Sequence, residues 1–153
     1  MRKLPLSQAR DRERGSAVVE FVAVTVILLI PAAYAILTLF QIQSAHFAAD
    51  GTAREAARII SEARDEGRAR AHVAALARLS AYDLGLEPDA VRIRLTCEAS
   101  PCLSAEALID VEVVIERPLP LIPAFLASRL PASVRVGASA VGVVNPYLQR
   151  SEP

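Results

Sequence analysis

Tryptophan is absent from this sequence of 153 residues, and aromatic residues together make up only 5% of it. Histidine and cysteine are almost as scarce, with two of each. A structural zinc site takes four ligands, and His46 and His72 lie far along the chain from Cys97 and Cys102. We therefore expect no metal centre and no cofactor, and we interpret both histidines as solvated or half-buried helix residues.

The sequence also lacks an excess of charge of either sign, since it has 17 basic and 17 acidic side chains. This balance conceals an asymmetry, because residues 1–15 hold five basic and two acidic side chains. The rest of the chain, with 12 basic and 15 acidic side chains, is mildly acidic. A nucleic-acid-binding domain presents a basic face on its folded part, so we exclude nucleic acid as a partner.

The motifs of the common catalytic sites are absent as well. The chain has no G-x-S-x-G nucleophile turn, no glycine-rich phosphate loop and no H-E-x-x-H zinc motif. The carboxylates of its C-terminal part occur on expected helix faces, or alternate along expected strands beside arginines, and none suggests a desolvated pair. We therefore expect a protein that is not an enzyme and that has no small-molecule substrate.

What the sequence does contain is a long uncharged run near its N-terminus. The 20 residues from Phe21 to Phe40 read FVAVTVILLIPAAYAILTLF. A helix of this length spans about 30 Å, the thickness of a bilayer's hydrocarbon core. Basic residues precede the run, and such residues stay on the cytoplasmic side. The sequence thus predicts a basic cytoplasmic leader over residues 1–15, a transmembrane helix over residues 16–41 and an extracytoplasmic remainder.

Two further expectations concern this apolar run. Pro31 lies near its middle, where the loss of one backbone donor predicts a kink. The alternative to a permanent anchor is a secretion signal that is cleaved after Ala33, or near Ala48 and Ala49. The apolar part of such signals usually has about 7–15 residues, which favours the anchor.

The border between the leader and the helix reads R-E-R-G-S-A-V-V-E-F over residues 12–21. Glu20 lies five residues after Gly15, in the first turns of the apolar helix. A carboxylate within the membrane costs roughly 2–3 kcal/mol at the centre and less near the edge, and such groups usually have a partner. Cleavage after Gly15 would create a free α-amine, which would place a positive charge nearby, in the same chain or in a neighbouring helix.

This border resembles the cleavage site of type IV prepilins, and more closely the N-terminus of the TadE-like family of the tight-adherence pilus system. The resemblance rests on residues 14–17 and 19–21 and on the proline-containing apolar run behind them. A second similarity is the alanine-rich segment AADGTAREAAR over residues 48–58. The similar parts cover about residues 14–60, and beyond them only the general layout agrees.

The resemblance implies a minor pilin or pseudopilin. A membrane prepilin peptidase would cut between Gly15 and Ser16, so that Ser16 becomes the N-terminus and Glu20 the fifth residue. Tight-adherence major pilins have tyrosine after the glutamate, whereas this chain has Phe21, which favours an accessory subunit. The implied partners are other pilins, pilus assembly proteins, the prepilin peptidase and the membrane. The alternative is an unprocessed single-pass anchor for a binding module, in which Glu20 reaches the lipid headgroups.

The first part of the extracytoplasmic head, which spans residues 42–146, continues the first helix. Residues 42–66 carry a stripe of small or aliphatic side chains at helical spacing: Ala49, Ala53, Ala56, Ile60 and Ala63. The stripe is either local core or a contact between subunits. The pairs Asp50–Arg54 and Arg58–Glu62 have the spacing of ion pairs on a solvated helix face.

A second helix is predicted over residues 68–84, after a break at residues 65–67. Its apolar side chains lie roughly on one side: Val73, Leu76, Leu79 and Leu84. Gly85 has the position of a C-terminal stop.

The apolar period then changes from that of a helix to that of a strand. Apolar and polar residues alternate over residues 91–98 and 109–116, which predicts two amphipathic strands. A third strand is expected at about residues 132–144, with Gly137 and Gly142 weakening it or marking bulges. The sequence therefore predicts an α+β, pilin-like fold, with a long N-terminal transmembrane helix, a second helix and a small three-stranded antiparallel sheet.

The loop between the first two strands contains both cysteines in the segment C-E-A-S-P-C. Outside the cytoplasm the environment is usually oxidising, so we expect Cys97 and Cys102 to form a disulfide that fixes an antiparallel hairpin. The alternative is a pair of free thiols in a reducing compartment, which would also reverse the predicted topology.

The proline-rich segment 117–131 is apolar for a connecting loop. Pro123 has the position to open a short helix that ends near Leu130. The segment is expected to cap the open sheet, with a docking patch as the alternative. The polar tail over residues 147–153 is expected to be disordered.

Overall fold

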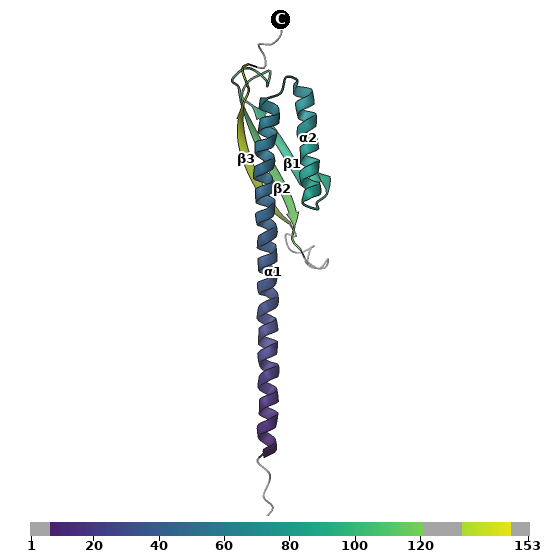
Figure 1. Ribbon diagram of the computed structural model, residues 1–153, viewed down its shortest axis with the longest axis vertical. Coiled ribbons are helices and arrows are strands. Elements are labelled where there is room, and N and C mark those ends of the chain that lie inside the picture. Colours follow the sequence, from purple (N-terminus) through teal and green to yellow (C-terminus); the bar gives the residue numbers. More distant parts are fainter. Residues whose placement is uncertain (1–6, 121–132, 148–153) are drawn as a thin grey trace, which may run out of the picture. The chain divides into compact units, whose positions relative to one another are not determined.

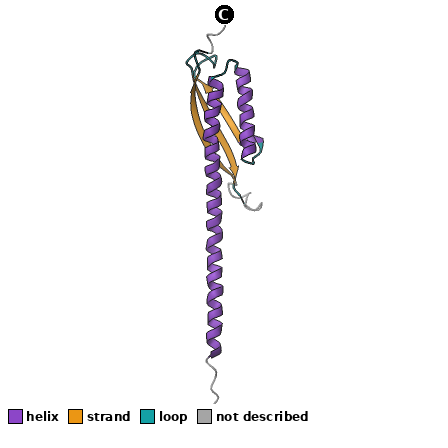
Figure 2. Cartoon of the chain, in the orientation of Figure 1, coloured by secondary structure: helices purple, strands orange, loops and turns teal. Residues whose placement is uncertain are grey.

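The computed structural model describes residues 7–120 and 133–147, and the side chains from residue 17 on (Figure 1). The chain divides into two compact units, residues 1–39 and residues 40–153. Helix α1 contributes to both units, and all other elements belong to the second. Figure 2 shows the helices in purple and the strands in orange. In chain order they are α1 (Ser7–Ser61), α2 (Glu66–Asp83), the 3₁₀ helix η1 (Pro88–Ala90), β1 (Val91–Cys97), β2 (Leu108–Pro118) and β3 (Ser133–Val143). This is the α+β layout expected from the sequence.

The first unit consists of α1 up to residue 39. From Ala17 on, nearly all its side chains are exposed, including the large apolar ones. The helix is long and apolar enough to cross a membrane. It continues through Pro31 without a break, and the kink expected there stays a prediction.

The sheet of the second unit is antiparallel throughout and has the order β1-β2-β3. Ile109, Val111, Val113 and Ile115 of the central strand β2 point to one face, where all four are fully buried. The alternation predicted for the first two strands is therefore confirmed. β2 is longer than predicted and includes Arg117 and Pro118, which the sequence had assigned to the connecting loop.

The core lies between this face of the sheet and the two helices. Ala49, Ala53, Ala56 and Ile60 are buried in it, so the stripe along the first helix belongs to the local core. Small residues allow the backbones of α1 and β3 to approach each other closely. A Cβ atom built on Gly142 would lie 2.9 Å from the carbonyl oxygen of Ala57.

Of the two alternatives expected for the glycines of β3, bulges are absent, and a weakened strand stays a prediction. The pairing of β2 with β3 is continuous from Leu108 opposite Val143 to Pro118 opposite Ser133. Gly142 instead provides room for α1. A Cβ on Gly137 would meet only the carbonyl oxygen of Val113, at an ordinary 3.5 Å.

The connection between the helices differs from the prediction. Helix α1 ends at Ser61, where its last carbonyl accepts a hydrogen bond from the N–H of Asn145 at 3.0 Å. Asp65 does not lie in a break of three residues but caps α2, since its carboxylate accepts a hydrogen bond from the N–H of Arg68 at 2.6 Å. Glu66 therefore starts the helix, because an aspartate at this position satisfies a free N–H of the first turn.

The apolar side of α2 is narrower than predicted. Val73 is buried and Leu76 and Leu84 are half-buried, but Leu79 is 57% exposed. A hydrogen bond of 2.8 Å between the hydroxyls of Thr52 and Ser80 joins α2 to α1.

The end of α2 agrees with the prediction. Gly85 has φ +64° and follows the last turn, and the N–H groups of Gly85 and Leu86 bond to the carbonyls of Tyr82 and Ala81. This is the Schellman arrangement that glycine favours. The expected helix from Pro123 and the predicted cap over the sheet lie outside the described residues, as does nearly all of the polar tail.

Candidate functional site

The predicted cleavage position lies within helix α1. Gly15 and Ser16 both have helical backbone, since α1 begins at Ser7. The carbonyl groups of a helix are engaged in hydrogen bonds four residues apart. Cleavage of this bond would therefore require the helix to open locally.

Glu20 and Phe21 follow one turn later, and both side chains are exposed, with Phe21 72% exposed. Glu20 forms no hydrogen bond or ion pair with any part of the chain that the structure describes. Ala17, Ala23 and Val24, which lie one turn before and after it on the helix, are apolar and also exposed. An ionised carboxylate in such surroundings needs a polar partner, which the described chain does not supply.

Two threonines in the same apolar helix differ in their hydrogen bonding. The hydroxyl of Thr25 donates to the carbonyl of Phe21 at 2.8 Å and is thus satisfied within its own helix. The hydroxyl of Thr38 is buried and has no hydrogen-bond partner among the described atoms. Thr38 lies eighteen residues after Glu20, which is five turns of about 3.6 residues, so the two lie on the same helix face. Thr25 lies on a different face.

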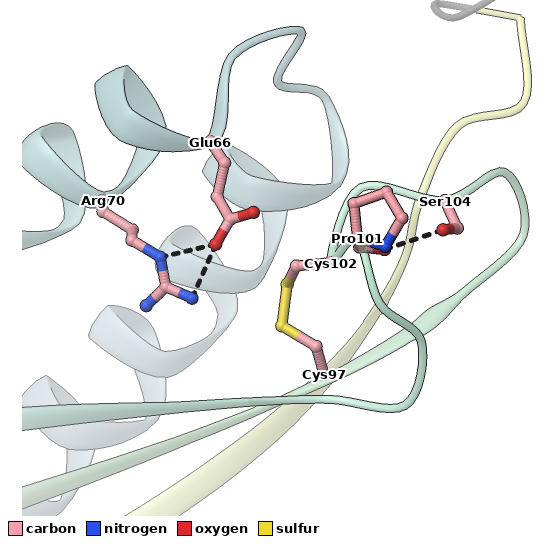
Figure 3. Close-up of a disulfide and its surroundings, with 6 residues drawn as sticks. All are labelled: Glu66, Arg70, Cys97, Pro101, Cys102 and Ser104. Atoms are coloured by element: carbon pink, nitrogen blue, oxygen red, sulfur yellow. Dashed lines mark hydrogen bonds and ion pairs between the residues drawn. A yellow bond between two sulfur atoms is a disulfide. The ribbon is translucent and has the colours of Figure 1, made fainter.

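The cysteines form the expected disulfide. Cys97 ends β1 and Cys102 lies in the following loop, with their Cα atoms 5.3 Å apart (Figure 3). The hydroxyl of Ser104 donates to the carbonyl of Pro101 at 2.7 Å in the same loop. β1 and β2 pair as the expected antiparallel hairpin, and the role of the disulfide in fixing it stays a prediction. The cysteines belong to the second unit, and the predicted cleavage position belongs to the first.

The charged side chains of the second unit form ion pairs on its surface. The predicted pairs Asp50–Arg54 and Arg58–Glu62 are present, with N···O distances of 2.7 and 2.9 Å. Arg58 also donates to Glu55 at 2.6 Å, and this hydrogen bond lowers the pKa of the Glu55 carboxyl from its ordinary value. These pairs are exposed, so they support the helix only weakly.

Within residues 7–120 and 133–147, no cluster of three or more His, Cys, Asp or Glu side chains could hold a metal ion. The expectations that the chain is not an enzyme and that it uses no cofactor stay predictions. Comparison with known protein families, curated proteins and solved structures gives no match for this chain. The likeness to TadE-like proteins therefore rests on the sequence motifs alone.

Two features of the structure were not predicted from the sequence. The first is the unsatisfied hydroxyl of Thr38, for which the helical spacing from Glu20 was an available signal. The second is a groove of ≈ 360 Å³ between α2 and β1, lined in part by Val73, Ile93 and Leu95. No sequence pattern indicates this groove, because it depends on how far α2 covers the edge of the sheet.

Proposed function

We propose that this chain is a single-pass membrane protein that acts as a TadE-like minor pilin or pseudopilin. In this proposal it helps to assemble a tight-adherence pilus or a related secretion apparatus. Its N-terminus lies in the cytoplasm and its α+β head lies outside. The observation that carries the proposal is Glu20, a carboxylate that is exposed on an apolar helix five residues after Gly15 and has no partner among the described residues.

The exposed apolar surface of the first unit supports a membrane location. Large apolar side chains such as Val24, Ile27 and Leu28 are more than half exposed along successive turns of α1. A contiguous surface of this kind is not stable in water and must be covered by lipid or by other helices. Because Ala45, Ala49 and Ala53 belong to the core of the head, the same helix provides both the anchor and part of the folded domain.

A polar group in such a helix favours association. Glu20 is such a group, because its exposed carboxylate lacks a partner in the described chain. In the membrane, an unpaired polar group gains stability when a neighbouring helix offers a donor. The new amine of Ser16, in this chain or in an adjacent pilin, would be such a donor.

The test is the N-terminus of the mature protein. We expect the chain purified from cells with an active prepilin peptidase to begin at Ser16, as measured by intact mass and N-terminal sequencing. Gly15→Leu should block this processing because it adds a side chain where the peptidase accepts glycine. Gly51→Leu is the matched control, since Gly51 is exposed in the same helix and a Cβ there meets nothing within 4 Å.

The competing function is an unprocessed membrane anchor for a binding module. It predicts that the protein from the same cells begins at Met1 and that Gly15→Leu changes nothing. That result would remove the pilin proposal and leave the membrane-anchored head.

A further inference from the structure

Strand β1 forms one edge of the sheet, and some of its backbone N–H and C=O groups point away from β2. The N–H of Glu98 donates to the carbonyl of Leu108 at 3.0 Å, just beyond the end of β1. In an antiparallel ladder the residues that bond to the partner strand alternate, so Thr96, Arg94 and Arg92 also bond to β2. The N–H and C=O groups of Val91, Ile93 and Leu95 then point to the free edge.

These edge groups are not used elsewhere in the described chain. No backbone hydrogen bond outside the sheet involves Ile93 or Leu95. An unpaired edge of this kind is a template for another strand.

The same three residues of β1 line the groove between this strand and α2. The opposite wall includes Ala74 and Ala77 of α2, and the groove has a volume of ≈ 360 Å³. The edge of β1 therefore borders an open space and is not covered completely by the helix.

The core layer is incomplete along this groove. The side chains of Ile93 and Leu95 point to the core face of the sheet but are only half-buried. Their neighbours on β2, Val113 and Val111, are 0% exposed. One more strand beside β1 would cover Ile93 and Leu95 in the way that β1 covers the side chains of β2.

The charges around the groove indicate which side chains an additional strand beside β1 should have. Arg78 lines the groove, and Arg92 is exposed on the outer face of β1; neither forms an ion pair with any described residue. Arg94, also on the outer face, pairs with Glu112 at 3.1 Å. Opposite charges on neighbouring strands stabilise a sheet, whereas like charges destabilise it.

We propose that the groove between α2 and β1 binds an extended segment of a partner protein as a fourth strand of the sheet. The segment alternates apolar residues, which cover Ile93 and Leu95, with acidic residues, which face Arg92 and Arg94. This binding site goes beyond the proposed role in assembly, because it lies in the head and does not depend on cleavage at Gly15. The mode is strand addition, in which main-chain hydrogen bonds give affinity and alternate side chains give specificity.

The first experiment measures binding of a synthetic probe to the full-length protein in detergent micelles. The probe is a fluorescent nine-residue peptide of alternating Glu and Val, and the control has Lys in place of Glu. We expect fluorescence anisotropy to show at least tenfold tighter binding of the Glu peptide. Equal binding of both peptides, or binding of neither, would overturn the proposal.

Variants locate the site on the protein. Arg92→Glu should weaken binding of the Glu peptide at least fivefold, because it replaces attraction by repulsion on the face where the Glu side chains lie. The matched control is Arg64→Glu, an exposed arginine in the connection between the helices that does not line the groove. An equal loss with Arg64→Glu would show non-specific attraction and would contradict a site at β1.

Methylated peptides test strand pairing itself. In one isomer the amide nitrogens of the Val residues are methylated, and in the other those of the Glu residues. A segment that pairs antiparallel with β1 presents the Val N–H groups to it, whereas a parallel segment presents the Glu N–H groups. We expect one isomer to lose at least tenfold in affinity and the other to bind nearly as the parent does. Loss with both isomers, or with neither, would rule out pairing along the edge.

Discussion

At the scale of single residues, the contact between the first helix and the sheet depends on Gly142. A Cβ atom there would lie 2.9 Å from the carbonyl oxygen of Ala57 and 3.4 Å from its Cβ. Backbone atoms cannot move aside as a flexible side chain can. Gly142→Ala should therefore lower the free energy of unfolding by roughly 1–3 kcal/mol, the usual effect of overpacking. Urea unfolding of the full chain in micelles, followed by circular dichroism, measures this change.

Gly137→Ala is the control for this prediction, because it makes the same change in the same strand. Its Cβ would lie 3.5 Å from the carbonyl of Val113, an ordinary contact. Alanine also restricts the unfolded chain more than glycine does, so this variant should be neutral or slightly more stable. Equal destabilisation by both variants would show that the approach of Ala57 is not the cause.

Gly85 supports the structure through its backbone conformation alone. Its φ is +64°, and a Cβ there would meet nothing within 4 Å. Gly85→Ala should lower the free energy of unfolding by roughly 1–2 kcal/mol, because residues with a Cβ resist this left-handed conformation. Gly51→Ala, where a Cβ also has free space but the backbone is helical, should raise it by roughly 0.5–1 kcal/mol. Thermal unfolding of the two variants should give shifts of opposite sign, and shifts of the same sign would contradict this account.

At the scale of elements, periodicity in the sequence predicted which segments are helices and strands. The alternation over residues 91–98 and 109–116 follows from one buried face, and the local chain shows it directly. Element ends were predicted less well, because they depend on single hydrogen bonds such as that from Arg68 to Asp65. The exposure of Leu79 and the role of Gly142 depend on how the elements pack together, which no local pattern reports.

The disulfide constrains the hairpin of β1 and β2. Closing a loop with a sequence separation of 5 should contribute roughly 2 kcal/mol to the free energy of unfolding by the chain-entropy model. We expect a mass two daltons below that of the reduced protein and a loss of stability of about this size on reduction. The variant with Cys97→Ser and Cys102→Ser should be as unstable as the reduced protein, and reductant should not change its stability. Thiols that react with a maleimide in intact, unreduced cells would refute both the bond and an oxidising location of the head.

At the scale of the whole molecule, the two units were predictable to different degrees. The apolar helix of the first unit could be predicted from residues 21–40, because length and absence of charge are local properties. The groove beside β1 could not be predicted, since it arises from the partial cover that α2 gives to Ile93 and Leu95. The role of Glu20 lies between these cases, because the sequence gives its apolar surroundings and the structure adds the lack of a partner in the described chain.

Glu20 is expected to act in the association of this chain with other pilins, and not in its folding. It is exposed and forms no hydrogen bond or ion pair with any described residue, so Glu20→Ala should leave the unfolding of the head unchanged. Loss of the carboxylate should remove the partner for a cationic amine in a neighbouring helix and so weaken association.

Membrane insertion, processing and association can be measured separately, by membrane fractionation, by cleavage at Ser16 and by crosslinking to other pilins in cells. Thr25→Val is the matched control, since the Thr25 hydroxyl is satisfied within its own helix and lies on a different face. We expect normal insertion and cleavage in both variants, and reduced crosslinking and adherence with Glu20→Ala alone. Normal piliation and adherence in the Glu20→Ala strain would contradict this role, because Glu20 is the only charged side chain among residues 17–40 of this helix.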